Sequence, residues 1–431
     1  MNGTTNPDAN RRNAGDDRSP LGTGPNRHPA SDDDAYLRKA SQRRSQTWVF
    51  AIVAVVVVVA LVGGAYAAGW IGKSGTTPSS QGYCAPGSAS ATLTGAGSTF
   101  VYPLMNVWTT DYQSACGTSV NYNAVGSGSG ISQLTARSVQ FGASDAPLSY
   151  SQTSQLPAPA VTMPDSGGAV AILYNLPGIA SGQLNLTVTI VANIYLGVIT
   201  NWNDTSIVSI NPGLKVPTLA ITVVHRSDGS GTTFAFTSWL AAGSSSWVSN
   251  IGPPGTTVNW KAGQVGASGS PRLANTVSTT SGAIGYAELN YAKLNGGAGG
   301  VPYAKIQNPA GNYIWPNATN TATAIGEIAS SLPAPTGNWS KVTAINQAGA
   351  QTYPIATLTY IVVYQDLGHA YGSGLSATQA AALASFLWWI THTGQASATG
   401  LFYVELPASI VHVDETAIGD LQYNGATLKS H

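Results

Sequence analysis

Charged residues are scarce in this sequence of 431 residues, and the two signs are balanced. Lysine and arginine together number 18, aspartate and glutamate together number 18, and the four types make up 8% of the chain. A nucleic-acid-binding protein would carry a basic patch or stripe, so this composition argues against that class. Gly, Ser, Thr, Ala and Asn fill positions that Lys and Glu usually occupy, which suits the surface of a secreted protein.

The few charges are also unevenly distributed. The first 72 residues hold 8 of the 18 basic and 6 of the 18 acidic side chains. The remaining 359 residues therefore carry only 10 basic and 12 acidic side chains. A charged residue in that long part of the chain is a candidate functional group, although most will be solvated surface.

Cysteine is nearly absent, with only Cys84 and Cys116 in the chain. The C-x-x-C motifs and His/Cys clusters of a zinc site are missing, so the sequence predicts no metal site and no cofactor. Two cysteines outside the cell suggest one disulfide bond between them. The alternative is two unpaired thiols, one of them buried.

The first 46 residues lack hydrophobic periodicity and are rich in Asn, Asp, Arg, Gly and Pro, which predicts a disordered segment. An uncharged run, WVFAIVAVVVVVALVGGAYAAGWI, follows at residues 48–71. About 20 apolar residues suffice to cross a bilayer as a helix. The run therefore predicts a transmembrane anchor over residues 47–72.

The flanks of this run predict its orientation. Basic residues favour the cytoplasmic side, and four precede the run at Arg38, Lys39, Arg43 and Arg44. The N-terminus should then lie inside the cell and the remaining chain outside. A cleaved signal peptide is the alternative, because Ala65-Tyr66-Ala67 fits an A-x-A cleavage site. Residues 73–90 are typical of a Ser/Gly/Pro tether.

From about residue 91 the pattern becomes that of an α/β protein, in which short apolar runs alternate with helical spacing. Strands are predicted at SVNYNAV (119–125), QFGASD (140–145) and ITVVHR (221–226). Helical stripes of apolar residues occur within 101–113 and 377–394 and predict core-facing helices.

Three loops of similar composition each precede a predicted helix. They are GAGSTF (95–100), VGSGSG (125–130) and the centre of HRSDGSGTTFAF (225–236), where a helix is expected to begin near Gly231. A helix N-terminus offers unpaired N–H groups and a partial positive charge, and together these bind anions. One such loop is more often an ordinary turn with a Ser or Thr cap. Three loops that converge would form a pocket of N–H and O–H donors around one anion.

Arg226 and Asp228 lie at the start of the third loop. A guanidinium fork matches a tetrahedral oxyanion, and Asp228 could orient it and offset part of its charge. The alternative is an exposed ion pair at a strand end, which would contribute about 0–1 kcal/mol.

Asp145 is an acidic residue in an unusual position, because it ends an apolar predicted strand in FGASDAPLS. An ionised carboxylate accepts hydrogen bonds and cannot donate them. It would repel a fully deprotonated anion and accept the hydrogen of a protonated one, so an anion pocket containing Asp145 would select phosphate over sulfate. The alternative is that Asp145 caps the turn that follows.

The chain resembles the phosphate-binding proteins of phosphate ABC importers from about residue 91 to the C-terminus. The resemblance is carried, in order, by GAGSTF, VNYNAVGSGSG, FGASDAPLS, NIYLGVITNWND, HRSDGSGTTFAFTSWL and SGAIGYAELNYAKLN. It implies an α/β, two-lobed periplasmic-binding-protein fold of type II, with the ligand between the lobes and two crossover strands as a hinge. The implied lobes are residues 91–172 plus 354–431, and residues 173–353.

The resemblance also implies the ligand-binding residues. Asp145 would accept the phosphate proton, and Asp228 would be the partner of Arg226. This chain departs from the family pattern at Gln140, in the GSGSG loop and in its N-terminal membrane span. The implied phosphate contacts are Thr99, Phe100, Ser127, Asp145, Arg226, Ser230, Gly231 and Thr232.

The resulting expectation is a receptor, anchored through residues 48–71 with its binding domain outside the cell, that passes phosphate to the permease subunits of an ABC importer. No catalysis is expected.

Three alternative functions belong to different classes. One is a phosphatase with Ser230 or Ser127 as nucleophile, for which His225 would be the only nearby histidine. The second is a receptor for sulfate, molybdate or arsenate, of which only arsenate carries protons as phosphate does. The third is a phosphate sensor or surface protein without a transporter.

Overall fold

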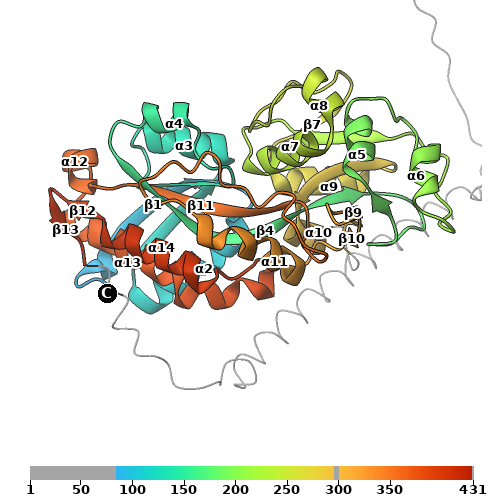
Figure 1. Ribbon diagram of the computed structural model, residues 1–431. Coiled ribbons are helices and arrows are strands. Elements are labelled where there is room, and N and C mark those ends of the chain that lie inside the picture. Colours follow the sequence, from blue (N-terminus) through green and yellow to red (C-terminus); the bar gives the residue numbers. More distant parts are fainter. Residues whose placement is uncertain (1–83, 296–299, 430–431) are drawn as a thin grey trace, which may run out of the picture. The chain divides into compact units, whose positions relative to one another are not determined.

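A mixed β-sheet of eight strands organises the part of the chain that the computed structural model describes, residues 84–295 and 300–429 (Figure 1). Neighbouring strands are parallel at both ends of the sheet and antiparallel around β11 and β4. We call β2, β1, β3 and β11 the first half of the sheet and β8, β6 and β7 the second half. The spatial order is β2 (Ser119–Ala124), β1 (Thr92–Gly97), β3 (Phe141–Ser144), β11 (Ala356–Tyr364), β4 (Ala160–Tyr174), β8 (Ala283–Glu288), β6 (Thr222–Arg226) and β7 (Val265–Ala267).

Helices lie on both faces of the first half. Figure 1 shows α3 (Ser127–Thr135) and α4 (Tyr150–Gln155) on one side, and α2 (Tyr102–Cys116), α13 (Ala377–Thr391) and α14 (Ala408–Gly419) on the other. In the second half, α9 (Ser270–Thr279) packs on β6 and β8. The other helices are α5 (Val188–Tyr195), α6 (Thr205–Ser209), α7 (Gly231–Gly243), α8 (Ser245–Asn250), α10 (Leu289–Leu294), α11 (Ala318–Ile328) and α12 (Leu367–Tyr371). Short strands complete the structure at β5 (Asn185–Leu186), β9 (Lys305–Gln307), β10 (Tyr313–Ile314), β12 (Gln422–Tyr423) and β13 (Ala426–Thr427).

Strand β4 joins the two halves of the sheet. Its residues 160–169 pair with β11 and its residues 170–174 pair with β8. Pro164 lies inside it, and proline within a sheet is tolerated at a bulge, where no ladder hydrogen bond is lost. The register with β11 shifts at this point, so that Ser166 and Pro164 face consecutive residues of β11 and Asp165 has no partner in the ladder.

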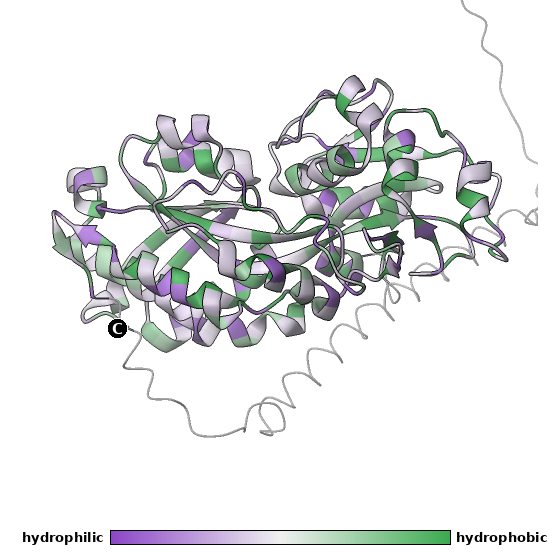
Figure 2. Ribbon diagram, in the orientation of Figure 1, coloured by the Kyte–Doolittle hydropathy of each residue, from purple (hydrophilic) through white to green (hydrophobic). Residues whose placement is uncertain are grey.

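The predicted elements of the first half and of the third loop are confirmed. The three predicted strands correspond to β2, β3 and β6, and the two helical stripes to α2 and α13. Apolar residues are concentrated in the strands and in the helices beside them (Figure 2). The ends of these elements differ from the predicted ones by up to three residues, and α3 begins at Ser127, inside the segment predicted as a loop. Gly and Ser are poor helix formers in isolation, but here the first turn of α3 is held against the loop after β6, where Gly128 N–H donates to the Gly229 carbonyl at 3.0 Å.

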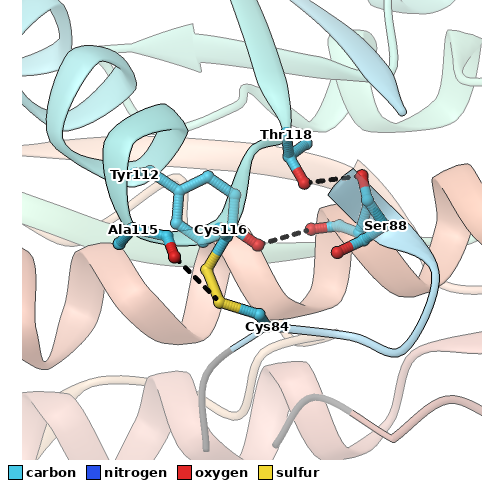
Figure 3. The surroundings of a disulfide bond; sticks show 7 residues. Cys84, Ser88, Tyr112, Ala115, Cys116 and Thr118 are labelled. Carbon is cyan, nitrogen blue, oxygen red and sulfur yellow. Dashed lines mark hydrogen bonds between the residues drawn. A yellow bond between two sulfur atoms is a disulfide. The ribbon is translucent and has the colours of Figure 1, made fainter. Parts of the chain in front are cut away.

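A disulfide bond joins Cys84, the first described residue, to Cys116 at the end of α2 (Figure 3). Their Cα atoms are 5.4 Å apart and 32 positions apart in sequence. Beside the bond, the Thr118 hydroxyl donates to the Ser88 carbonyl at 2.8 Å. Closing a loop of this length stabilises the folded state by roughly 3 to 4 kcal/mol in the chain-entropy account.

The predicted disordered segment at 1–46, the predicted anchor at 47–72 and most of the predicted tether at 73–90 lie outside the described residues. Within residues 84–295 and 300–429, no helix is both long enough and apolar enough to cross a membrane.

Two buried carboxyl groups lie close to the long strand, away from the predicted site. Asp165 accepts a hydrogen bond from the Thr359 hydroxyl, and neither carboxyl oxygen of Asp414, on α14, has a hydrogen-bond partner among the described residues. Burial, followed by the charge of Asp165 and of Glu415, raises the pKa of Asp414 well above its ordinary value. Burial and the charge of Asp145 do the same to the pKa of Asp165. The folded protein therefore favours the neutral form of both groups.

This burial predicts a pH-dependent stability. An Asp with a raised pKa keeps its proton in the folded state, while the unfolded chain releases that proton above about pH 4. The free energy of unfolding therefore falls as the pH rises from about 4 towards the folded-state pKa. We expect Asp414→Asn to raise the melting temperature at neutral pH by about 2 °C or more and to give no gain near pH 4. The exposed Asp420→Asn is the control, and parallel profiles of melting temperature against pH for Asp414→Asn and wild type would contradict the prediction.

Candidate anion-binding site

The charged pair and third loop singled out in the sequence form the junction between β6 and α7. Arg226 is the last residue of β6, and its side chain is only 1% exposed. Ser230 caps α7, because its hydroxyl accepts the Thr233 N–H at 3.1 Å. Gly231 is the first residue of the helix, which confirms the predicted start. The strand thus delivers a guanidinium beside the N–H groups of a helix N-terminus.

Arg226 and Asp228 form a bidentate ion pair. The distances are 2.7 Å from Nε to Oδ1 and 2.5 Å from Nη2 to Oδ2, and Asp228 also accepts the Gly269 N–H at 3.0 Å. Burial by itself disfavours both charges. The mutual hydrogen bonds and attraction outweigh it, so the pKa of Asp228 is lowered and that of Arg226 is raised. The pair is not an exposed ion pair at a strand end, because Arg226 is buried.

Asp145 follows β3 directly and is 2% exposed. Its carboxylate accepts hydrogen bonds from the Ser98 hydroxyl and, at 3.2 Å, from the Ser127 hydroxyl. Burial raises the pKa of Asp145 to about 7, helped by the negative charge of Glu288 and opposed by Ser98, Arg226 and Ser127. Asp145 can therefore change its protonation state near neutral pH.

The turn after β3 is held by another residue. The Ser144 hydroxyl donates to the Ala146 carbonyl at 2.7 Å and accepts the Ala146 N–H at 3.1 Å. Ser144 therefore caps this turn, and Asp145 does not. Its side chain is turned towards the Ser98 and Ser127 hydroxyls instead.

The three Gly/Ser loops converge, a condition that the sequence alone left open. The Gly231 N–H donates to the Ser127 hydroxyl at 3.1 Å, which joins the second and third loops. Thr99, from the first loop, lies 3.2 Å from the Ser270 hydroxyl, which accepts from Arg226 Nη1 at 2.8 Å. The approach is close enough to require glycine, because a Cβ on residue 231 would lie 2.6 Å from the Asp145 Cβ.

Several of the predicted donors are paired within the protein. The Phe100 N–H donates to the Ser98 hydroxyl at 2.8 Å, and the Gly231 N–H donates to Ser127. The Thr232 hydroxyl donates to Glu288. An anion that enters the site would compete for the two N–H donors, while the Ser98 and Ser127 hydroxyls already donate to Asp145.

The sequence did not single out Ser98, Ser270 or Glu288. Ser98 lies inside the first Gly/Ser loop, so composition pointed at its segment but not at its role. Ser270 begins α9, and Glu288 ends β8 next to the end of β6. Glu288 is 1% exposed, and burial raises its pKa although Arg226, Thr232 and Ser270 oppose the shift. The signal that could have found it is its position at the end of an apolar run, the same signal that marked Asp145.

The site has an open side and no metal cluster. A cavity of about 490 Å³ borders it, lined by Thr99, Tyr122, Asp228, Gly269, Arg272 and their neighbours. Within residues 84–295 and 300–429, no three His, Cys, Asp or Glu side chains are grouped so that they could hold a metal ion.

His225 does not reach the serines that a phosphatase would use. Its ring stacks on Trp260 with centroids 4.7 Å apart, and its Nδ1 lies 2.9 Å from the Arg226 carbonyl oxygen. Burial lowers its pKa and so favours its neutral form. The ring is thus held beside the strand by stacking rather than hydrogen-bonded to Ser127 or Ser230.

The fold and the convergent loops correspond to a known class of binding protein. A sequence model described as a PBP superfamily domain matches residues 84–392. A solved structure of a high affinity periplasmic phosphate-binding protein, bound with phosphate, shares this fold. It has a TM-score of 0.59 and 24% identity, over 74% of this chain and 92% of that chain.

Curated relatives narrow the class further. A phosphate-binding protein PstS from Xylella fastidiosa is 37% identical over 345 residues, which is 79% of this chain and 87% of that protein. Another, from Pasteurella multocida, is 36% identical over 328 residues, 74% of this chain and 88% of that protein. The chain belongs to the phosphate-binding-protein family of the PBP superfamily, a family of substrate-binding receptors rather than of enzymes.

The contact between Gly231 and Asp145 gives a test of the site geometry. Gly231→Ala adds a Cβ that overlaps the Asp145 backbone, with distances of 2.7 Å to its Cα and carbonyl carbon, so α7 must retreat from Asp145. We expect calorimetric titration with inorganic phosphate to show an affinity at least about tenfold lower, the loss of about one hydrogen bond. Gly326→Ala, on α11 with nothing within 4 Å, is the matched control. Equal affinities for the two variants would show that the close approach is not needed for binding.

Proposed function

We propose that this protein is an extracytoplasmic receptor that binds inorganic phosphate and delivers it to an ABC-type phosphate importer. The combination of Asp145 with Arg226 and the convergent donor loops carries the proposal. An ionised, buried carboxylate can only accept, so the bound anion must bring its own proton. Phosphate carries protons near neutral pH and sulfate does not. The names of the curated relatives support the same ligand.

The proposed binding residues are those that the family resemblance implied. Arg226, held by Asp228, would face the phosphate with its remaining N–H groups, and Asp145 would accept the phosphate proton. Burial of each predicted residue and the hydrogen bonds between the three loops support this assignment. The other proposed contacts are Thr99, Phe100, Ser127, Ser230, Gly231 and Thr232.

Phosphate would be enclosed by two lobes, one of residues 91–172 plus 354–431 and the other of residues 173–353. Strand β4, shared by both halves of the sheet, supports this division, because a rotation between the lobes would pass through it. The hydrogen bonds from Gly128 to Gly229 and from Gly231 to Ser127 cross between the proposed lobes. These bonds would break when the lobes open to admit or release phosphate.

The receptor would be held at the membrane by residues 48–71 and would meet the permease subunits there. Two alternatives share the phosphate site, namely a phosphate sensor or surface protein without a transporter, and a receptor for arsenate, which carries protons as phosphate does. Binding and release suffice for all of these roles, and no catalytic step is proposed.

Selection by Asp145 predicts a pH-dependent preference between two anions. At about pH 8.5, above the Asp145 pKa of about 7, we expect wild type to bind phosphate and not sulfate. Asp145→Asn removes the repelling charge and should raise sulfate affinity at least about tenfold. At about pH 5.5 a protonated Asp145 can donate, so wild type should begin to admit sulfate. The measurement is calorimetric titration with both anions, with the exposed Asp111→Asn as control. A wild type that does not bind phosphate at either pH would overturn the receptor proposal.

The anchor can be tested on the full-length chain in its host membrane. We expect the chain to remain with the membrane after an alkaline carbonate wash, because about 20 apolar residues span the bilayer stably. A variant without residues 48–71 should be released, or fail to leave the cytoplasm. N-terminal sequencing of the membrane-free protein distinguishes the alternative, since a mature chain that begins just after Ala67 would indicate a cleaved signal peptide instead.

A further inference from the structure

Glu288 is a second buried carboxyl group at the proposed site. It ends β8, next to the end of β6, and its Oε1 accepts a hydrogen bond from the Thr232 hydroxyl. Its Oε2 has no hydrogen-bond partner of ordinary geometry among the described residues, although the Ser270 hydroxyl is near enough to lower the pKa of Glu288. The side chain is therefore held in place at one oxygen and incompletely paired at the other.

The site holds more negative than positive charge when its groups are ionised. Arg226 provides the positive charge, and Asp228 already pairs with it in bidentate geometry. Asp145 and Glu288 remain, both buried and each without a cation of its own. An arriving phosphate adds further negative charge to this surplus, and the binding of a proton can offset it.

We propose that Glu288 is a specificity-determining carboxylate of this site, and that its charge sets how many protons the site and the bound oxyanion hold together. The inference rests on the proposed phosphate-binding function. When a doubly charged phosphate enters while Asp145 and Glu288 are both ionised, one proton is taken from solvent. The proton goes either to a phosphate oxygen or to one of the two carboxyl groups, and no other bond forms or breaks.

Like charges in a buried site explain this uptake. Like charges repel strongly in an environment of low dielectric, and binding a proton removes one of the charges at the smallest cost in free energy. The groups that face Glu288 are Arg226 from β6, Asp145 after β3, Tyr291 on α10 and Tyr403 from the segment before α14. Burial together with the charges of Glu288 and Asp145 keeps both tyrosines neutral, because it raises their pKa values. Among these groups Arg226 alone is a cation, and Arg272, which lines the bordering cavity, is exposed to solvent.

Thr232 transmits the same preference by its hydrogen bond. A threonine hydroxyl has one hydrogen, and while Glu288 is ionised that hydrogen is donated to it. Thr232 Oγ1, which accepts from Arg226 Nη1 at 3.5 Å, then keeps one lone pair for the ligand and acts as an acceptor, as Asp145 does. A phosphate that carries two hydrogens satisfies both acceptors, whereas a fully deprotonated oxyanion satisfies neither. Glu288 thus favours the more protonated form of phosphate without touching it.

Proton uptake is measured by titrating phosphate calorimetrically in two buffers that differ in ionisation enthalpy. At about pH 8.5, where free phosphate is mostly the doubly charged form, wild type should take up about one proton per phosphate bound. Glu288→Gln should take up clearly fewer protons and bind phosphate about tenfold more tightly at this pH. Glu288→Asp, which restores the charge on a shorter side chain, should recover the wild-type proton count.

Glu327→Gln is the matched control, because Glu327 is exposed on α11. It should leave both the proton count and the affinity unchanged. A Glu288→Gln variant with the wild-type proton count would overturn the inference, since a purely structural role moves affinity but not proton number. A wild type that binds phosphate without taking up a proton overturns it too, even if Glu288→Gln fails to fold. A wild type that binds no phosphate overturns the receptor proposal itself.

Discussion

The burial of a single guanidinium is the constraint on which the rest of the site depends. Removing Arg226 from water is costly unless most of its N–H groups find acceptors, and an unpaired buried charge would destabilise the fold strongly. Asp228 takes two of these groups and Ser270 a third. Asp228 is itself fixed by the Gly269 N–H, so the ends of β6 and the start of α9 are locked together. The positions of the loops that carry Asp228 and Ser270 therefore depend on the hydrogen bonds that the buried charge of Arg226 requires.

Scarcity of cations elsewhere shapes the remaining electrostatics. Beyond residue 72 the chain has only 10 basic side chains, yet among the described residues four carboxyl groups are buried, at Asp145, Asp165, Glu288 and Asp414. With few cations available, protons take the role of counter-ion, and the pKa of each of these groups is raised. The same physical effect acts at two places with different results. Around β4 we expect it to tie stability to pH, and at the proposed site it would tie ligand choice to protonation.

Short stretches of the sequence were enough to predict the features of the fold and the site that depend on neighbouring residues alone. The apolar spacing of α2 and α13, the Gly/Ser composition of the three loops and the isolated acid after β3 are all visible in short windows of sequence. The start of α3 was missed because its first turn is held by a long-range contact. The Gly128 N–H donates to the Gly229 carbonyl, about a hundred positions later in the chain. Glu288 was missed for a related reason. Its position at the end of an apolar run is visible in the sequence, but its burial comes from packing against distant segments such as the one that contains Tyr403. The bulge at Asp165 likewise depends on pairing with β11, almost two hundred residues away.

In the proposed receptor, which would be anchored through residues 48–71, the disulfide between Cys84 and Cys116 has a mechanical consequence. Tension applied along the chain reaches the domain at Cys84 and passes through covalent bonds directly to the end of α2. Residues 85–115, including all of β1, form a closed loop that carries none of this load. The hydrogen bonds that pair β1 with β3 therefore lie outside the load path, whereas β2, which follows Cys116, lies in it. Strand β1, which leads into the loop that contains Thr99, would keep its register with β3 under such a pull.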